Sequence, residues 1–238
     1  MVLAATVAYD TPIFWAVFIA WILSVVIHEF AHGVVAYWGG DYTIKERGGL
    51  TLNPIQYIDP VMSIVLPIAI FLIGGIPLPG GVTYVRRDLL RSRAWDAAVS
   101  AAGPLMNFLL FLALVMPFHP KLRWVEPTAI SEAGNAVIFM GAMALLQMVS
   151  VLFNLIPIPP LDGFGIISPF MDPRTREKFM TPPLSFGLFF ALFLLAGPLG
   201  LIDRFFRLII RLLIALGFDG RTIRFLIDSY NQALFGAA

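Results

Sequence analysis

The chain of 238 residues is 59% hydrophobic and 13% charged, which makes it far more apolar than a soluble domain of similar length. We therefore expect an integral membrane protein. The net charge of +1 is small and the basic residues fall in short loops, which argues against nucleic acid as a partner. Because the chain has no cysteine, disulfides and thiolate chemistry are excluded, and any metal site must use histidine and carboxylate ligands.

The first predicted element is a membrane helix over residues 12–38. Trp15 and Trp21 near its start, and Tyr37 and Trp38 at its end, are typical of membrane interfaces. The residues before it contain no Lys or Arg, and the apolar run is long enough to span a bilayer. We therefore expect a retained helix and no cleaved signal peptide.

The ionisable side chains of this helix are His28, Glu29 and His32. Ionisable groups at membrane depth are costly and are treated as functional by default. Histidines four residues apart share a helix face and can hold one zinc ion at roughly 2.0 to 2.1 Å. Glu29, at the edge of that face, can activate a water that attacks a peptide carbonyl. The alternative, a chance match of two packing histidines and a stray glutamate, leaves that cost unexplained.

The next apolar run, residues 61–78, is long enough to span, yet it contains Pro67, Gly74, Gly75 and Pro77. It is either a span or a re-entrant element. The remaining predicted elements are membrane helices at residues 94–116, 133–155 and 184–202, a helix at 203–218 that spans or lies in the interface, and an amphipathic helix at 221–234.

A catalytic zinc usually takes three protein ligands. His119 stands at a helix end and is better explained as an interfacial histidine. Asp59, Asp96 and Asp162 are the carboxylates next to apolar segments. A turn explains Asp59, which precedes a proline, and helix capping explains Asp96. Asp162 follows a helix broken by prolines and could point inward, although an Asp-Gly turn is the better explanation from local sequence alone.

Three blocks of the sequence resemble the signature blocks of the site-2 protease family of intramembrane zinc metalloproteases. The resemblance extends over about residues 12–170. The blocks are His-Glu-Phe-Ala-His at 28–32, Ala-Gly-Pro-Leu-Met-Asn at 102–107 and Asn-Leu-Ile-Pro-Ile-Pro-Pro-Leu-Asp-Gly at 154–163.

This resemblance implies one zinc ion per chain, held by His28, His32 and Asp162. It implies that Glu29 is the general base and later the proton donor, and that Asn154 holds the substrate or stabilises the oxyanion. Gly103, Pro104 and Asn107 would be helix-packing and positioning residues.

Two features depart from the family pattern. Gly165 stands where many members carry a basic residue shortly after the Asp-Gly pair. The chain also leaves no room for the PDZ or CBS domains of larger members, so we expect a compact member. Substrate recognition would then come from the membrane core, the loops or a separate protein.

The distribution of basic residues favours a particular topology. If residues 61–78 span, the basic loop residues divide seven against four. If they are re-entrant, nine lie on one side and Lys121 and Arg123 on the other, in better agreement with the positive-inside rule. We therefore expect the N-terminus outside and the zinc motif toward the cytoplasmic end of the first helix. The nine are Lys45, Arg47, Arg86, Arg87, Arg91, Arg93, Arg174, Arg176 and Lys178.

Together these observations predict an all-α polytopic membrane protein with about five to six membrane segments. We expect a single domain over residues 1–238, with a core at about 12–170 and C-terminal helices at about 184–235. The pieces at 48–53 and 76–85 near the site are predicted to be strand-like, with solvated loop as the alternative for both. The expected activity is zinc endopeptidase cleavage of transmembrane protein substrates in regulated intramembrane proteolysis, at a bacterial inner membrane.

Three alternatives stay open. A transporter or channel would need polar residues in several helices, and a non-catalytic metal-binding scaffold would normally have lost Glu29 or a ligand. A different membrane zinc peptidase family with the same first motif would usually take a downstream glutamate as its third ligand.

Overall fold

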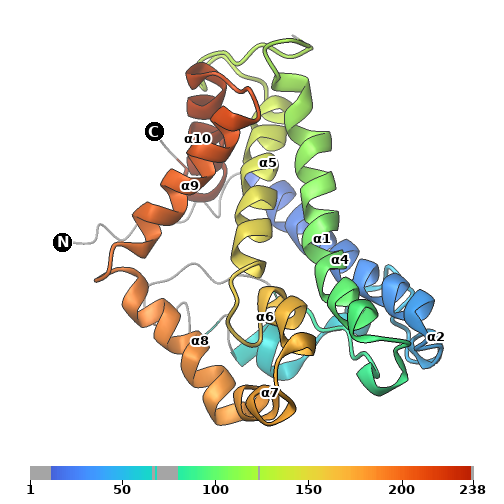
Figure 1. Ribbon diagram of the computed structural model, residues 1–238. Coiled ribbons are helices and arrows are strands. Elements are labelled where there is room, and N and C mark those ends of the chain that lie inside the picture. The colour runs from blue at the N-terminus through green and yellow to red at the C-terminus, as the bar shows by residue number, and fades with distance from the viewer. Residues whose placement is uncertain (1–11, 66–67, 69–79, 123, 237–238) are drawn as a thin grey trace. The chain divides into compact units, whose positions relative to one another are not determined.

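The computed structural model describes residues 12–65, 68, 80–122 and 124–236 (Figure 1). These residues form helices, turns and irregular segments, and no β-strand occurs among them. The predicted helical class is therefore confirmed, whereas the predicted strand pieces are not formed where the structure describes them. Residues 48–53 make a turn and a bend, and residues 80–86 are irregular. Residues 76–79 lie outside the described part of the chain.

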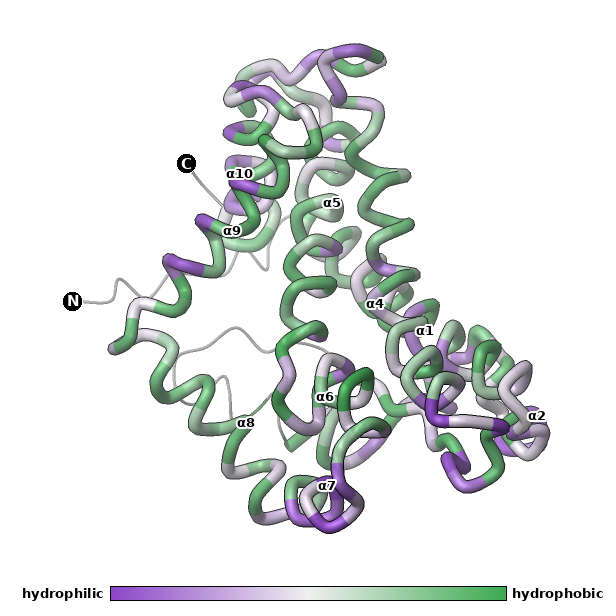
Figure 2. Tube along the Cα trace, viewed as in Figure 1, coloured by the Kyte–Doolittle hydropathy of each residue, from purple (hydrophilic) through white to green (hydrophobic). Residues whose placement is uncertain are grey.

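Three helices are long and apolar enough to cross a membrane: α1 (Pro12–Gly39), the helix that begins with α4 (Arg93–Val115), and α5 (Asn135–Asn154). A fourth span exists if α7 (Pro173–Met180) and α8 (Pro182–Ala196), bent by 68° at their junction, are taken as one. Figure 2 shows that α7 is largely hydrophilic and α8 largely hydrophobic. The helices indicate membrane association, but the described residues do not reach the five to six segments predicted.

The bounds of the long helices follow from proline and glycine. Pro12 occupies the first position of α1, where a missing amide donor costs nothing. Gly40, with φ of +121°, turns the chain away directly after the last residue of the helix. Most of the segment at 61–78 lies outside the described residues. Its described start is a single π-helical element, η2 (Pro60–Val65), and its predicted re-entrant path stays a prediction.

The chain falls into two compact units, and the boundary between them cuts α1, α4, α5 and the start of α9 (Leu201–Ala215). The first unit comprises residues 1–21, 108–150 and 203–238, and the second comprises 22–107 and 151–202. The prediction of one domain over the whole chain stays a prediction. All the residues that the sequence marks as candidate site residues belong to the second unit.

The first unit contains most of α5 and most of α9, together with η4 (Met116–Phe118) and α10 (Gly220–Phe235). Phe118 packs on Phe225 of α10 with ring centroids 5.4 Å apart. His119 packs edge-on against Phe218, and its Nε2 lies 3.3 Å from the carbonyl oxygen of Leu216. These contacts agree with a packing role for His119. The predicted helix at 221–234 is α10.

The second unit contains the short elements around the candidate site. They are α2 (Thr43–Glu46), η1 (Pro54–Tyr57), η2, η3 (Arg87–Leu89), α6 (Asp162–Ile167) and η5 (Ser168–Phe170), followed by α7 and α8. Buried Leu161 and Phe189 form a small core with partly buried Phe153, Ile156 and Phe193. This core attaches α8 to the turn between α5 and α6, and therefore fixes the position from which Asp162 starts α6.

Candidate metal centre

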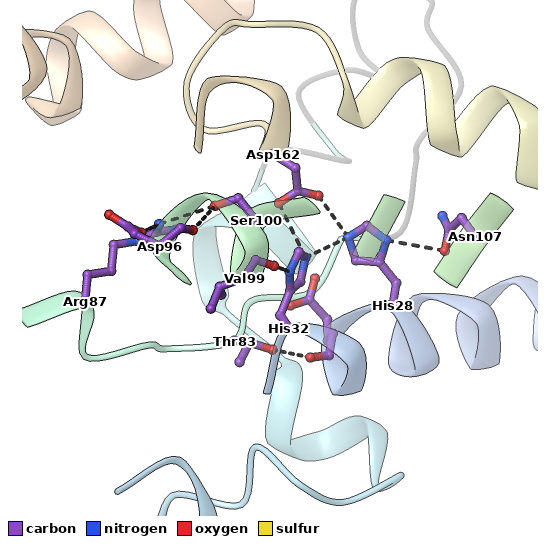
Figure 3. A network of polar contacts seen from close by, with 10 residues as sticks. His28, His32, Thr83, Arg87, Asp96, Val99, Ser100, Asn107 and Asp162 are labelled. Atoms are coloured by element: carbon purple, nitrogen blue, oxygen red, sulfur yellow. Dashed lines mark hydrogen bonds and ion pairs between the residues drawn. The ribbon is translucent and has the colours of Figure 1, made fainter. Parts of the chain in front are cut away.

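Two buried histidines of α1 and one aspartate of α6 converge on a single point (Figure 3). His28 and His32 are 6% and 7% exposed, and their Nε2 atoms are 3.1 Å apart. The carboxylate of Asp162 lies against both rings, with Oδ2 at 3.1 Å from Nε2 of His28 and Oδ1 at 3.4 Å from Nε2 of His32. Residues far apart in the sequence thus provide three donor groups to one small volume.

The other ring nitrogens fix which atoms are available as ligands. Nδ1 of His32 lies 2.6 Å from the carbonyl oxygen of Val99, which can only accept, so this nitrogen carries the proton and donates. Nδ1 of His28 lies 3.3 Å from Oδ1 of Asn107, an acceptor of the same kind. Both Nε2 lone pairs therefore face one another and the Asp162 carboxylate. These two lone pairs and the negative carboxylate repel one another unless a cation lies among them.

The spacing of these donors fits zinc. Tetrahedral ligands about 2.0 to 2.1 Å from a zinc ion lie about 3.3 Å from one another, and the observed separations are 3.1 to 3.4 Å. A Cβ atom at Gly103 of α4 would clash with Nε2 of both histidines. Only glycine lets α4 approach this closely and leave room for an ion. Two histidines and a carboxylate are also the donors of known catalytic zinc sites with an open fourth position.

The other carboxylates considered from the sequence have different partners. Asp96 is bound by Arg87 and Arg176. Asp59 accepts hydrogen bonds from the Tyr84 hydroxyl and from backbone N–H groups at the start of η2. The hydrogen bond from Tyr84 holds the pKa of Asp59 below its usual range. Asp162 is therefore the aspartate, among these three, whose carboxylate contacts the histidines.

Glu29 is 7% exposed and lies beside the two histidines. One side-chain ligand atom from each of His28, Glu29 and His32 falls within 4.8 Å of the others. The backbone carbonyl of Glu29 accepts a hydrogen bond of 2.9 Å from the Thr83 hydroxyl. A carboxylate placed in this way can reach a water at the metal without itself being a required ligand.

A pocket of about 430 Å³ opens onto the metal centre. Its walls include the three α1 residues and Asp162, consecutive residues from Gly81 to Val85, and Phe186 of α8. Asn154, the last residue of α5, also lines it. The pocket thus places Asn154, which the sequence marked as a substrate or oxyanion residue, in the same cavity as the histidines.

The 80–86 segment forms one wall of this pocket and is held at successive points. The Val82 amide donates to the Tyr57 carbonyl at 2.9 Å, and the Arg86 amide donates to Oδ2 of Asp41 at 2.7 Å. Arg47 donates to the carbonyl of Tyr84 at 2.8 Å. Because these partners are a carbonyl of the helix η1 and two side chains instead of a neighbouring strand, the segment has no β-ladder, which explains why the strand prediction is wrong here.

A buried ion-pair cluster ties this wall to α4 and α7. Asp96, 5% exposed, binds Arg87 from η3, and Arg176 from α7 at 2.8 Å. Arg87 also donates to Ser100 at 3.3 Å. A Cβ atom at Gly165 would clash with the Ser100 hydroxyl. The basic residue that many family members carry near this position therefore has no room here, and Arg87 is the neighbouring cation.

The sequence interpretation missed several residues that shape the site. Asp41 is not among the carboxylates considered from the sequence, although it is fully buried and holds the Arg86 amide. Thr83 and the carbonyl of Val99 carry no local signal at all. The basic loop containing Arg87 was used only to argue topology. The contacts of these residues cannot be predicted from the local sequence, because they are made with residues that only the folded chain brings close.

The close approach of Gly81 to the glutamate leads to a prediction. A Cβ atom at Gly81 would lie 2.9 Å from Cγ of Glu29 and 3.2 Å from Cγ1 of Val25. Gly81→Ala should therefore displace Glu29 and lower kcat about ten- to a hundredfold with the zinc content unchanged. Zinc content and cleavage rate are measured on the same preparation. Gly134→Ala, whose Cβ meets nothing within 4 Å, is the matched control; an equal loss in both variants would contradict the prediction.

A buried His-Glu-x-x-His pattern on an apolar helix, completed by a distant aspartate, is the constellation of a membrane-associated zinc metalloprotease. Curated relatives agree. The chain is 36% identical over 186 residues to "Putative zinc metalloprotease Rip2" of Mycolicibacterium smegmatis, covering 78% of this chain and 68% of the relative. It is 37% identical over 180 residues to "Putative zinc metalloprotease YwhC" of Bacillus subtilis, covering 75% and 79%. The chain belongs to the site-2 protease family of zinc metalloproteases.

The match to Rip2 of Mycobacterium tuberculosis has the same identity and extent as that to the Mycolicibacterium smegmatis protein. No family model matches the chain. No solved structure matches it either.

Proposed function

We propose that this protein is an intramembrane endopeptidase that hydrolyses peptide bonds in or near transmembrane segments of other membrane proteins. The observation that carries the proposal is the place of the site: His28, Glu29 and His32 are buried on α1, one of the three helices apolar enough to span. A soluble substrate would not require a metal centre within such a helix. We place the protein in a bacterial inner membrane as a multi-pass chain that takes part in regulated intramembrane proteolysis.

His28, His32 and Asp162 would hold one zinc ion. That ion, when bound, polarises the scissile carbonyl and activates a water. The Glu29 carboxylate takes a proton from the attacking water as its oxygen bonds to the carbonyl carbon. The same carboxylate then gives the proton to the leaving amide nitrogen as the carbon–nitrogen bond breaks. No other proton carrier is needed, because one carboxylate serves both steps.

The substrate must present an extended backbone, because a peptide carbonyl inside an intact helix is hydrogen-bonded and sterically covered. We infer that it lies along the 80–86 segment, whose residues Gly81 to Val85 line the pocket one after another. Asn154, in the same pocket, would donate its amide to the substrate or to the oxyanion. Backbone pairing with such a segment would compensate the polar groups freed when a substrate helix unwinds.

Reconstitution tests this function directly. The purified chain is placed in liposomes with a model single-span substrate, and the products are identified by mass spectrometry. We expect a cut within or next to the span, abolished by a zinc chelator and restored by added zinc. Cleavage confined to a soluble peptide of the same sequence, or activity insensitive to chelation, would contradict the proposal. A catalytically silent protein that retains zinc would favour the scaffold alternative.

A further inference from the structure

Helix α9 is amphipathic and too short to cross a bilayer by itself. Its 15 residues extend about 22 Å, against about 30 Å for a hydrocarbon core. Ile209 and Leu213, on one side, are each 1% exposed and therefore buried in the protein. One face of the helix is therefore packed on protein, and the opposite face is exposed.

The outward face carries three arginines. Arg204, Arg207 and Arg211 are all exposed, and at 100° per residue they fall within an arc of about 60°, opposite the buried pair. Leu208 and Ile214 flank this arc and are 46% and 58% exposed. Figure 2 shows the hydrophilic positions recurring along one side of α9. Exposed apolar side chains on both flanks of a cationic stripe match the boundary between headgroups and acyl chains.

The charge of the three guanidinium groups points to the kind of partner that this face can bind. Within the part of the chain that the structure describes, none of them forms an ion pair with a carboxylate. Asp203 is the acidic residue of α9, and it lies in the first turn. Guanidinium forks bind phosphate oxygens in pairs. Phosphate groups carried by a membrane surface are therefore the complementary partner for this face.

We propose that α9 lies in the membrane interface and binds the headgroups of anionic phospholipids through Arg204, Arg207 and Arg211. Leu208 and Ile214 enter the upper acyl region on either side. The occupant is a lipid of the phosphatidylglycerol type. This proposal depends on membrane association and not on proteolysis, so the two can fail separately. It also assigns the predicted helix at 203–218 to the interface and excludes a span.

Lipid binding to the purified full chain provides the first test. Native mass spectrometry of the protein in detergent measures bound phosphatidylglycerol against phosphatidylcholine. Each cation near an anionic surface contributes about a fivefold preference, so the variant with all three arginines changed to Gln should lose about a hundredfold in preference for phosphatidylglycerol. The variant with all three changed to Lys keeps the charge but loses the paired guanidinium hydrogen bonds, so its preference should fall between those of the unaltered protein and the Gln variant. Equal binding of phosphatidylcholine by the unaltered protein would overturn the proposal.

The control removes the same charge elsewhere. Lys45, Arg174 and Lys178 are exposed residues of other segments, and changing all three to Gln should leave the preference within about threefold. An equal loss of lipid preference in this control would show that anionic lipid is attracted to the overall positive charge of the protein and not to a site on α9. That result would overturn the assignment. Inorganic phosphate at the same concentration should not compete with the lipid. Full competition by phosphate would reveal a free-anion site and would also overturn the proposal.

The depth of α9 can be measured without altering its charge. The chain has no cysteine, so Leu208→Cys gives a single site for a nitroxide label. In liposomes containing phosphatidylglycerol, the label should be relaxed more by oxygen than by a water-soluble nickel complex, as expected for a side chain in the upper acyl region. A label exposed mainly to the nickel complex would contradict the interfacial position, even if the charge variants failed to fold.

Discussion

Glu29→Gln is expected to reduce peptide hydrolysis by about a thousandfold or more, while the zinc content stays unchanged. The amide has almost the shape of the carboxylate but cannot take a proton from water. The proposed metal ligands His28, His32 and Asp162 are untouched, because Glu29 lies beside them and the proposed set of three is complete without it. Cleavage of a model transmembrane substrate and zinc content by mass spectrometry are measured on one preparation.

Glu46→Gln is the matched control. Glu46 is exposed on α2, so this substitution makes the same chemical change outside the pocket. It should cleave at the rate of the unaltered protein. Full activity in Glu29→Gln would refute the assigned base. Loss of zinc together with activity would make Glu29 a ligand, and the general base would have to be sought elsewhere.

Asp162→Ala is expected to lose both zinc and activity. The side chain contributes both carboxylate oxygens near the histidines, at 3.1 and 3.4 Å. Two imidazoles on one helix would then hold the ion without a third protein donor. Because loss of a supporting hydrogen bond alone weakens metal sites 10- to 100-fold, loss of a ligand should lower zinc affinity by more than about a hundredfold. Competition with a chromogenic chelator measures the affinity.

The control for this change is Asp88→Ala, which removes an exposed carboxylate paired with Arg86 on the surface. Its zinc affinity should be unchanged. If Asp162→Ala bound zinc normally, the third ligand would have to be another residue, and the family-based ligand set would be wrong for this chain. Circular dichroism of both variants separates metal loss from unfolding, because the helical signal is preserved when only the site is lost.

The first helix and its motif could be predicted from sequence because both are local. An uninterrupted apolar run indicates a membrane helix, and two histidines four apart must share its face. The bounds of α1, α4 and α5 lie close to those predicted for the same reason. The role of Asp162 was different. Local sequence favoured a simple turn, and only the resemblance to a family pointed to Asp162 as a ligand. The structure brings its carboxylate to the two histidines.

The walls of the site could not be predicted, because they are made by contacts between distant segments. The 80–86 segment has the β-branched residues of a strand, yet backbone groups along it are bound by η1 and by the side chains of Asp41 and Arg47. Its partners are determined by tertiary packing, which overrides local propensity. Gly103 belongs to a motif recognised in the sequence, but its contact with both imidazoles appears only in three dimensions.

The contact at Gly103 also bears on selective inhibition. Because α4 closes the ligand cluster on one side, a metal-binding head group has to enter from the pocket side, past residues 81–85. A slim hydroxamate or phosphonate on a linear peptide scaffold suits that approach, whereas a bulky ring fused to the head group would meet the helix. Bulky side chains substituted at Gly103 should accordingly displace the two imidazoles, prevent zinc binding and abolish activity, as a chelator would. A bulkier residue at Gly81 that blocks a slim inhibitor would also disturb Glu29, because an added Cβ there meets its side chain.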